Sequence, residues 1–298
     1  MQLSFISQAT LIVYFCASTH YIRQLFIMEY EIKPAGKFSL GLHELWEFRE
    51  LFYFFTWRDI KIKYKQAILG IFWAILQPLF LMILFSLFFG QALKVPSDNI
   101  PYPVFVFSGL LLWNVFSSGL TNAANSMVAN SNIIKKIYFP RLIIPMSSIL
   151  VALFDFIMSL FIYIGLLIYY HYSIDWTFIV FLPASVIMVV LTTFGLGTFI
   201  AAVNIKYRDF RYILPFLVQI LLFLTPVIYP VSIIRQGWIQ NIMLLNPIAG
   251  AIDLLRACVI HSSPDWSLIG VNFLVSVCLF ASGVIYFRKT EYYFADLA

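Results

Sequence analysis

The sequence predicts an all-α integral membrane protein that crosses the bilayer six times. Hydrophobic residues make up 62% of its 298 residues and charged residues only 11%, whereas about a quarter of the residues of a soluble domain are charged. Uncharged stretches also recur along the chain. The first, 69–89, would form a helix about 32 Å long, enough to cross a hydrocarbon core of about 30 Å. Because such stretches recur, one buried helix in a soluble protein does not explain them.

The first 41 residues are expected to be an N-terminal extension. Their apolar run at 11–17 is too short to span a bilayer. It also lacks the preceding cation that a signal peptide carries. The hypothesis is that translation starts at Met28, which would make residues 1–27 not native.

An amphipathic helix is expected over residues 42–66. Charged side chains such as Glu47 and Arg58 recur at helical spacing, and aromatic side chains such as Phe48 and Phe52 occupy the other side. This pattern is typical of a helix lying in the membrane interface. Four cations, Arg58, Lys61, Lys63 and Lys65, stand at its end, directly before the first span.

The rest of the chain, 67–298, is expected to form the six-span domain. The predicted spans are about 69–89, 102–125, 142–169, 177–203, 212–230 and 266–287. Six spans place both termini on one face, and sixteen Lys and Arg residues lie on that face against three on the other. Because positively charged flanks stay in the cytoplasm, both termini are expected there.

Residues 130–141, NSNIIKKIYFPR, lie between the second and third spans on the predicted cytoplasmic face. The segment carries five apolar or aromatic side chains beside its cations. An exposed apolar patch of this kind marks a protein interface, so the segment is expected to contact a protein partner.

Residues 231–263 are too apolar for an ordinary external loop and too interrupted to span the membrane. Asn246 followed by Pro247 predicts a helix start, with Asn as the N-cap and Pro at the first helical position. Two short helices that re-enter the outer leaflet are expected here. Irregular backbone at that depth requires protein or a water-filled cavity beside it.

Enzyme and metal motifs are absent from the sequence. It has no nucleotide-binding P-loop, GxSxG or HExxH motif, and Cys16, Cys258 and Cys278 are isolated, which favours neither disulfides nor a zinc site. The net charge of +5 comes from cations beside apolar runs, where they meet lipid head groups, so no nucleic-acid partner is expected. The sequence therefore favours a transport protein over an enzyme.

Asp155 is an ionisable residue inside the third predicted span. Such residues face a cavity or a partner, so it could serve a polar pathway or lock helix packing. Packing, near Asn114 or Asn122, is favoured because the spans contain no second acid that would make a proton relay.

Four segments resemble the permease subunit of bacterial ABC exporters for O-antigen, capsule and related polysaccharides. They are ELWEFRELFYFFTWRDIKIKYKQAILGIFWAILQPL (44–79), FSGLLLWNVFSSGLTNAANSMVANSNIIKKIYFPR (107–141), AAVNIKYRDFRYILPFLVQILLFLTPVIYP (201–230) and LLNPIAGAIDLLRACV (244–259). The resemblance covers about 42–287. The order of the four motifs is specific, although each alone is weak.

This resemblance implies a homodimer in the bacterial inner membrane, served by two separate ABC ATPase subunits. ATP and Mg²⁺ would bind to those ATPases, with no cofactor on this chain. The substrate would be a polysaccharide on undecaprenyl diphosphate, moved from cytoplasm to periplasm through a channel at the dimer interface.

The resemblance also implies roles for individual segments. Residues 130–141 would be the coupling helix, with contact candidates Ile133, Ile134, Lys135, Lys136, Tyr138, Phe139 and Arg141. The helix at 42–66 would also touch the ATPase. Residues 231–263 would form external gate helices, with Trp238, Asn246, Pro247 and Arg256 as candidates.

Substrate contacts are expected from two sets of residues. The cations Arg58, Lys61, Lys63 and Lys65 would attract the lipid diphosphate, although anchoring to the membrane explains them equally well. Aromatic faces stack on sugar rings, which makes Phe72, Trp73, Phe85, Trp113 and Phe116 candidates for lining a channel. Lipid-facing aromatic belts are the alternative.

Three other functions stay open on the sequence. One is an ABC permease for a drug, a lipid or a teichoic-acid-like polymer, which the same architecture serves. Another is a membrane enzyme acting on lipid-linked sugars, which would turn over substrate without an ATPase. The third is an ion-coupled carrier, whose transport would continue after ATP depletion. The absence of visible inverted repeats counts mildly against it.

Overall fold

Every secondary-structure element in the described part of the chain is a helix. The computed structural model describes residues 42–65, 69–173, 175–207, 209–233, 243, 245–260, 262–291 and 294, so the predicted N-terminal extension lies outside it. The elements are α2 (Leu42–Glu47), α3 (Arg49–Lys65), η1 (Gly70–Phe72), α4 (Trp73–Phe85), the π-helical η2 (Ser86–Ala92), α5 (Tyr102–Ala129), α6 (Ser131–Ile134), α7 (Ile143–Tyr169), α8 (Trp176–Lys206), α9 (Phe210–Leu224), η3 (Val231–Ile233), α11 (Pro247–Ile260) and α12 (Trp266–Thr290).

Five helical stretches in the described part of the chain are long and apolar enough to cross a membrane. They are Gly70–Ala92, formed by η1, α4 and η2, and the helices α5, α7, α8 and α12. These stretches correspond to the first, second, third, fourth and sixth predicted spans. The all-helical prediction holds for the described residues, and five of the six predicted spans correspond to candidate membrane-spanning helices among them.

The predicted fifth span is interrupted. Helix α9 has 15 residues, or about 22 Å of helix, which is shorter than a hydrocarbon core of about 30 Å. It ends where Thr225 turns extended, at φ −93° and ψ 138°. Pro226 follows, and a proline disfavours the helical conformation in the residue before it. The sequence pattern of apolar residues continues past the point where the helix stops.

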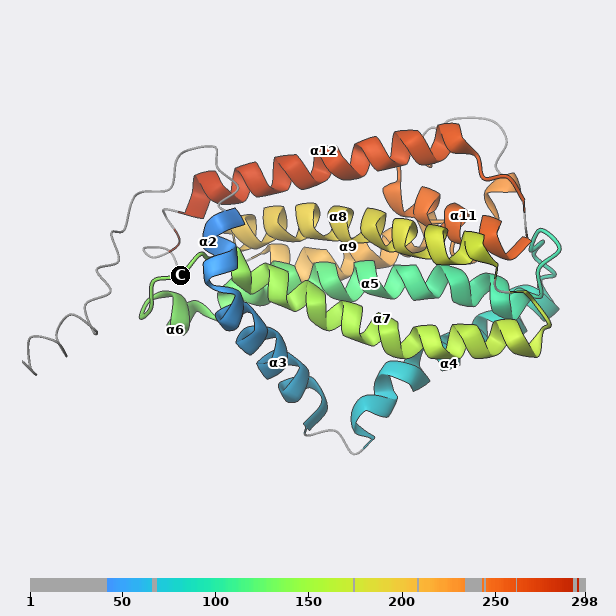
Figure 1. Cartoon of the computed structure of the whole chain (residues 1–298), viewed down its shortest axis with the longest axis horizontal. Coiled ribbons are helices and arrows are strands. Elements are labelled where there is room, and N and C mark those ends of the chain that lie inside the picture. Colours follow the sequence, from blue (N-terminus) through green and yellow to red (C-terminus); the bar gives the residue numbers. More distant parts are fainter. Residues whose placement is uncertain are drawn as a thin grey trace, which may run out of the picture. The chain divides into compact units, whose positions relative to one another are not determined.

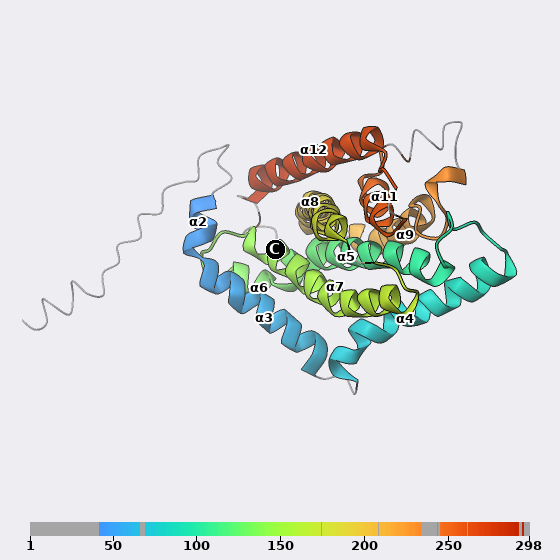
Figure 2. The same ribbon diagram turned by 45° about the vertical axis from the view of Figure 1, so that its right-hand side comes forward.

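Helix α5 is the centre of the bundle. Its most apolar window is 78% buried, against 39% or less for the other four stretches. It packs against α7 and α8, and α8 packs in turn against α11 and α12. Figures 1 and 2 show α5 beside α7 and α8, with α12 on the far side of α8. Residues that face α5 are therefore enclosed by protein on most sides.

Helices α8 and α12 cross at two glycines. A Cβ on Gly283 would lie 1.9 Å from the Gly195 carbonyl oxygen, and one on Gly195 would lie 2.3 Å from the Leu279 oxygen. Small residues permit this close backbone approach between membrane helices. The contact fixes α12 against the bundle.

The expected amphipathic helix is broken at Phe48 into α2 and α3, and α3 packs against α7 (Figure 1). The apolar side of α3 is partly packed against other helices and partly exposed. Phe55 is 2% exposed and its ring lies 5.6 Å from that of Phe139, whereas Ile62 is 67% exposed. The aromatic face of this helix is thus partly a packing surface.

Candidate functional site

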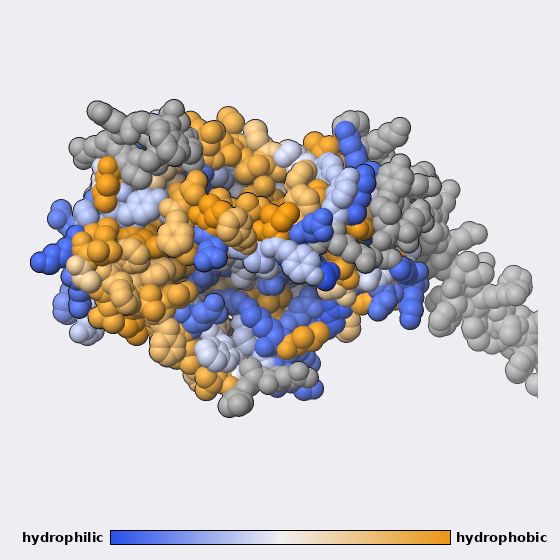
Figure 3. Space-filling view, turned by 180° about the vertical axis from the view of Figure 1, so that it is seen from behind, coloured by the Kyte–Doolittle hydropathy of each residue, from blue (hydrophilic) through white to orange (hydrophobic). Residues whose placement is uncertain are grey.

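A cleft of about 1120 Å³ lies between α3, α4, α5, α7 and α9. Helix α5 contributes more polar residues to its lining than any other helix does. On the face shown in Figure 3, hydrophilic side chains gather in a band between hydrophobic surfaces. Polar groups inside a bilayer are energetically costly. Polar side chains gathered in a cleft among apolar helices therefore make the cleft the candidate functional site.

The polar lining from α5 is a single stripe. Between residues 104 and 127, every side chain that is not buried is Asn, Ser or Thr, and each of these lines the cleft. The six are Asn114, Ser117, Ser118, Thr121, Asn122 and Asn125. Their spacing of three and four residues puts them on one helix face. The sequence analysis named only Asn114 and Asn122, as neighbours of Asp155, and it did not predict the stripe, although this spacing is the signal that would find it.

Two of the three hydroxyl groups of the stripe donate to their own helix. Ser118 Oγ donates to Asn114 O at 2.8 Å, and Thr121 Oγ1 donates to Ser117 O at 2.7 Å. Each oxygen keeps lone pairs that can accept from a ligand. Within the described residues, the side-chain amides of Asn114 and Asn122 have no hydrogen-bond partner. The stripe therefore offers both donors and acceptors without a charge.

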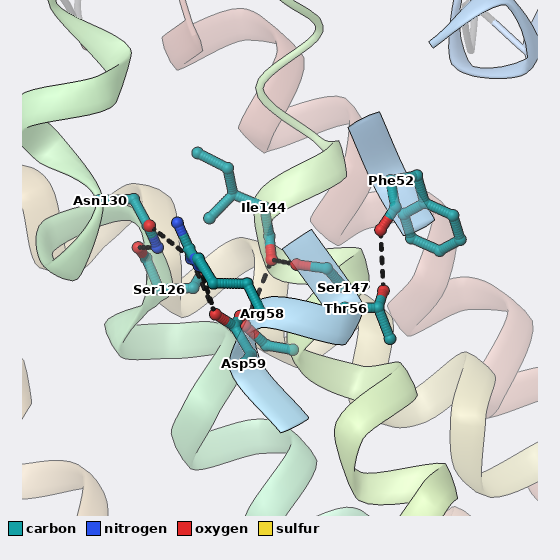
Figure 4. A network of polar contacts seen from close by, with 9 residues as sticks. Phe52, Thr56, Arg58, Asp59, Ser126, Asn130, Ile144 and Ser147 are labelled. Atoms are coloured by element: carbon teal, nitrogen blue, oxygen red, sulfur yellow. Dashed lines mark hydrogen bonds and ion pairs between the residues drawn. The ribbon is translucent and has the colours of Figure 1, made fainter. Parts of the chain in front are cut away.

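One end of the cleft carries a hydrogen-bonded network, shown in Figure 4. Arg58 Nη2 donates to Asp59 Oδ1 and to Asn130 Oδ1, both at 2.8 Å. Asn130 Nδ2 donates to Ser126 O at 2.8 Å. The Arg58 guanidinium also lies 4.7 Å from the centre of the Phe55 ring. The network joins α3 to the end of α5.

Asp155 of α7 faces the same cleft and binds the end of α3. Its carboxylate pairs with Lys63 Nζ and accepts a hydrogen bond from the Tyr64 hydroxyl. These partners differ from Asn114 and Asn122, which were expected beside it. Burial, and then the hydrogen bond to Asp155, raise the pKa of the Tyr64 hydroxyl. Asp155 thus ties α3 to α7.

The four cations expected at the substrate entry are divided between two sides of α3. Arg58 and Lys63 line the cleft and are paired with carboxylates. Lys61 and Lys65 are exposed beside Trp57, around a smaller hollow of about 330 Å³ that Arg58 also lines. Neither Lys61 nor Lys65 has an ion-pair partner among the described residues.

Of the five aromatic residues expected in a channel, Trp73 lines the cleft and the others do not. Phe72 is 63% exposed, and Phe85 packs on Phe89. Trp113 and Phe116 are buried, with ring centres 5.4 Å apart. Trp113 and Phe116 were expected to line a channel. They lie in the interior instead, because neighbouring helices enclose this part of α5.

The predicted coupling segment contains the short α6 and a turn after it. Ile137 and Tyr138 are 62% and 67% exposed, and the neighbouring Lys135 and Lys136 are also exposed. The remaining candidates are less open. Ile133 is half-buried, Ile134 and Phe139 are buried in the cluster with Phe55, and Arg141 binds the backbone oxygen of Glu291. The expectation that Ile134 and Phe139 face the cytosol is wrong, because they anchor the segment.

The predicted helix start at Asn246 and Pro247 is confirmed by α11. Asn246 Oδ1 accepts from the Ile248 N–H at 3.1 Å, Pro247 is the first helical residue, and Asn246 Nδ2 donates to Thr225 Oγ1 at 2.9 Å. Trp238, another gate candidate, lies outside the described residues. Helix α11 is thereby joined to the turn that follows α9.

The buried side chain of Arg256 also joins α11 to the turn that follows α9. Its side chain is 5% exposed and lies 3.5 Å from the centre of the Phe105 ring. The guanidinium donates to Pro226 O at 2.7 Å and to Val227 O at 2.9 Å. It also reaches Ser108 Oγ at 3.3 Å. It supplies hydrogen bonds to backbone oxygens that lie outside the helices.

The chain is similar in sequence to one known family and to several known proteins. The sequence model of the ABC-2 type transporter family matches residues 50–260. An O-antigen export system permease protein RfbA from Myxococcus xanthus is 30% identical over 256 residues, which cover 84% of this chain and 97% of the relative. An RfbA from Klebsiella pneumoniae is 27% identical over 242 residues, covering 81% and 92%. The polysialic acid transport protein KpsM of Escherichia coli is 25% identical over 241 residues, covering 78% and 91%.

The family match spans most of the chain, including the cleft, the coupling segment and α11. The bundle of long apolar helices agrees with a multi-pass membrane protein. The protein belongs to the ABC-2 type transporter family.

Proposed function

We propose that this protein is the membrane subunit of an ATP-driven exporter that moves lipid-linked polysaccharide of the O-antigen type from cytoplasm to periplasm. The observation that carries the proposal is the polar cleft along α5, since a hydroxylated polymer needs a hydrogen-bonding path through apolar helices. The relatives named for O-antigen and polysialic acid export support this substrate class.

The assembly in this proposal is a dimer of two copies in the bacterial inner membrane, with both termini in the cytoplasm. Two separate ABC ATPase subunits bind ATP and Mg²⁺ and drive transport. In this arrangement α9 and the residues after it serve as the sixth crossing, helices within 231–263 act as the external gate, and the helix at 42–66 lies at the cytoplasmic interface.

The ATPase docking surface in this proposal is the exposed part of the coupling segment. Ile137 and Tyr138 form an apolar pair beside the cations Lys135 and Lys136. An apolar pair with charged neighbours resembles the centre and rim of a protein interface. The buried Phe139 would hold the segment in place by packing on Phe55.

Co-purification with a co-expressed ABC ATPase tests the proposal. The wild-type chain is expected to retain the ATPase in detergent, and Ile137→Asp with Tyr138→Asp is expected to release it. Tyr207→Asp is the matched control, because Tyr207 is also exposed, at 51%, in a loop between two membrane helices. Retention of the ATPase by the double variant would contradict the docking surface, and a wild-type chain that binds no ATPase would contradict the proposed function.

A further inference from the structure

We infer that the stripe on α5 is a track for uncharged sugar residues, and that the exported polymer is electrically neutral along its repeating chain. The inference rests on the proposed function and adds the chemistry of the cargo. The track consists of Asn114, Ser117, Ser118, Thr121, Asn122 and Asn125.

The dimensions of the cleft fit a segment of polymer. Its volume of about 1120 Å³ exceeds the roughly 300–1,000 Å³ of a pocket for one small molecule. From Asn114 to Ala129, both of which line the cleft, α5 rises about 22 Å. This length accommodates several linked sugars along one helix face.

The spacing of the polar groups favours movement. Each polar step on the stripe advances by three or four residues, or about 5–6 Å along the helix. Conduction requires binding that is favourable but weak and repeated over many sites. Uncharged amide and hydroxyl groups in a row meet this requirement, because each hydrogen bond lost to a moving sugar hydroxyl is replaced at the next position.

The charges in the cleft cancel. Its four charged side chains are two cations and two anions, and they form the pairs Arg58–Asp59 and Lys63–Asp155. A polyanion would have to be desolvated here without an unpaired cation to receive it, which is costly. Neutral sugars carry no such cost. An acidic polymer, such as the one in the name of KpsM, is therefore disfavoured in this cleft.

Isosteric substitutions in the complete exporter test the track. Thr121→Val with Asn122→Leu removes two polar groups at nearly unchanged volume, and about a tenfold fall in surface polymer is expected from the loss of two hydrogen-bonding positions. The control is Thr290→Val on α12, because Thr290 also donates to its own helix, at 2.8 Å to Tyr286 O, but does not line the cleft. ATPase retention, oligomeric state and Tm are measured for each variant.

The outcomes separate the inference from the proposed function. A selective fall in export for the double variant, with assembly and Tm unchanged, supports the track. Unchanged export overturns it and leaves the exporter intact, whereas a wild-type complex that exports no polymer overturns the proposed function itself. If the double variant does not fold, Thr121→Val alone is measured against Thr290→Val under the same criteria. Finding a carboxylate or phosphate in every repeat of the exported polymer would overturn its predicted neutrality.

Discussion

Replacing Arg256 by Met is expected to destabilise the protein by removing the donors that serve the turn after α9. The carbonyls of Pro226 and Val227 accept from the guanidinium at 2.7 and 2.9 Å, and among the described residues neither accepts a second hydrogen bond. Each buried carbonyl left without a donor costs about 1–3 kcal/mol, so two cost about 2–6 kcal/mol. Met also removes a buried cation, which recovers part of this cost. The lower end of the range is therefore expected.

Thermal unfolding of the detergent-solubilised protein measures the effect. A loss of about 2 kcal/mol lowers Tm by about 3 °C for a chain of this size. Arg256→Lys keeps a cation but not the planar fork, so its Tm should fall between those of the wild type and Arg256→Met. The control is Arg49→Met, since Arg49 is exposed and touches Trp46. Equal Tm values for Arg49→Met and Arg256→Met would refute the role given to the guanidinium.

Three further substitutions probe the packing of the helices. Gly283→Val should sharply reduce the yield of monodisperse protein in size-exclusion chromatography, because a Cβ at this position would lie 1.9 Å from the α8 backbone. The control is Gly270→Val on the same helix, which faces open space and should be tolerated. Asp155→Asn should lower Tm, and adding Lys63→Gln should lower it little further, because both substitutions remove the same ion pair; fully additive losses would count against the pair. Asn246→Ala should cost about 1 kcal/mol in thermal unfolding and Asn246→Asp less, since aspartate keeps the capping oxygen.

Much of the fold is predictable because the bilayer imposes a length on each helix. The predicted second span, 102–125, and third span, 142–169, correspond to α5 and α7. Asn246 and Pro247 also predict the start of α11, since capping is a local property of the backbone. Helix α9 is the exception. Apolar composition continues to Pro230, but the conformation of Thr225 ends the helix earlier.

The site was less predictable because hydropathy does not distinguish lipid from protein as surroundings. Trp113 and Phe116 are apolar and aromatic whether they face a channel, lipid or the bundle core, and only the packing around α5 shows that they are buried. The partners of Asp155 are likewise set by tertiary structure, since Lys63 is 92 residues away in sequence. The stripe that includes Thr121 and Asn122 was accessible from periodicity alone.

Inverted membrane vesicles test the central claim most directly. Lipid-linked polymer is supplied outside the vesicles, and its entry is measured by protection from an added glycosidase. Protection is expected only when this chain, its ATPase and ATP are all present, because the chain provides the path and the ATPase provides the energy. Protection by this chain without an ATPase or ATP would contradict the account.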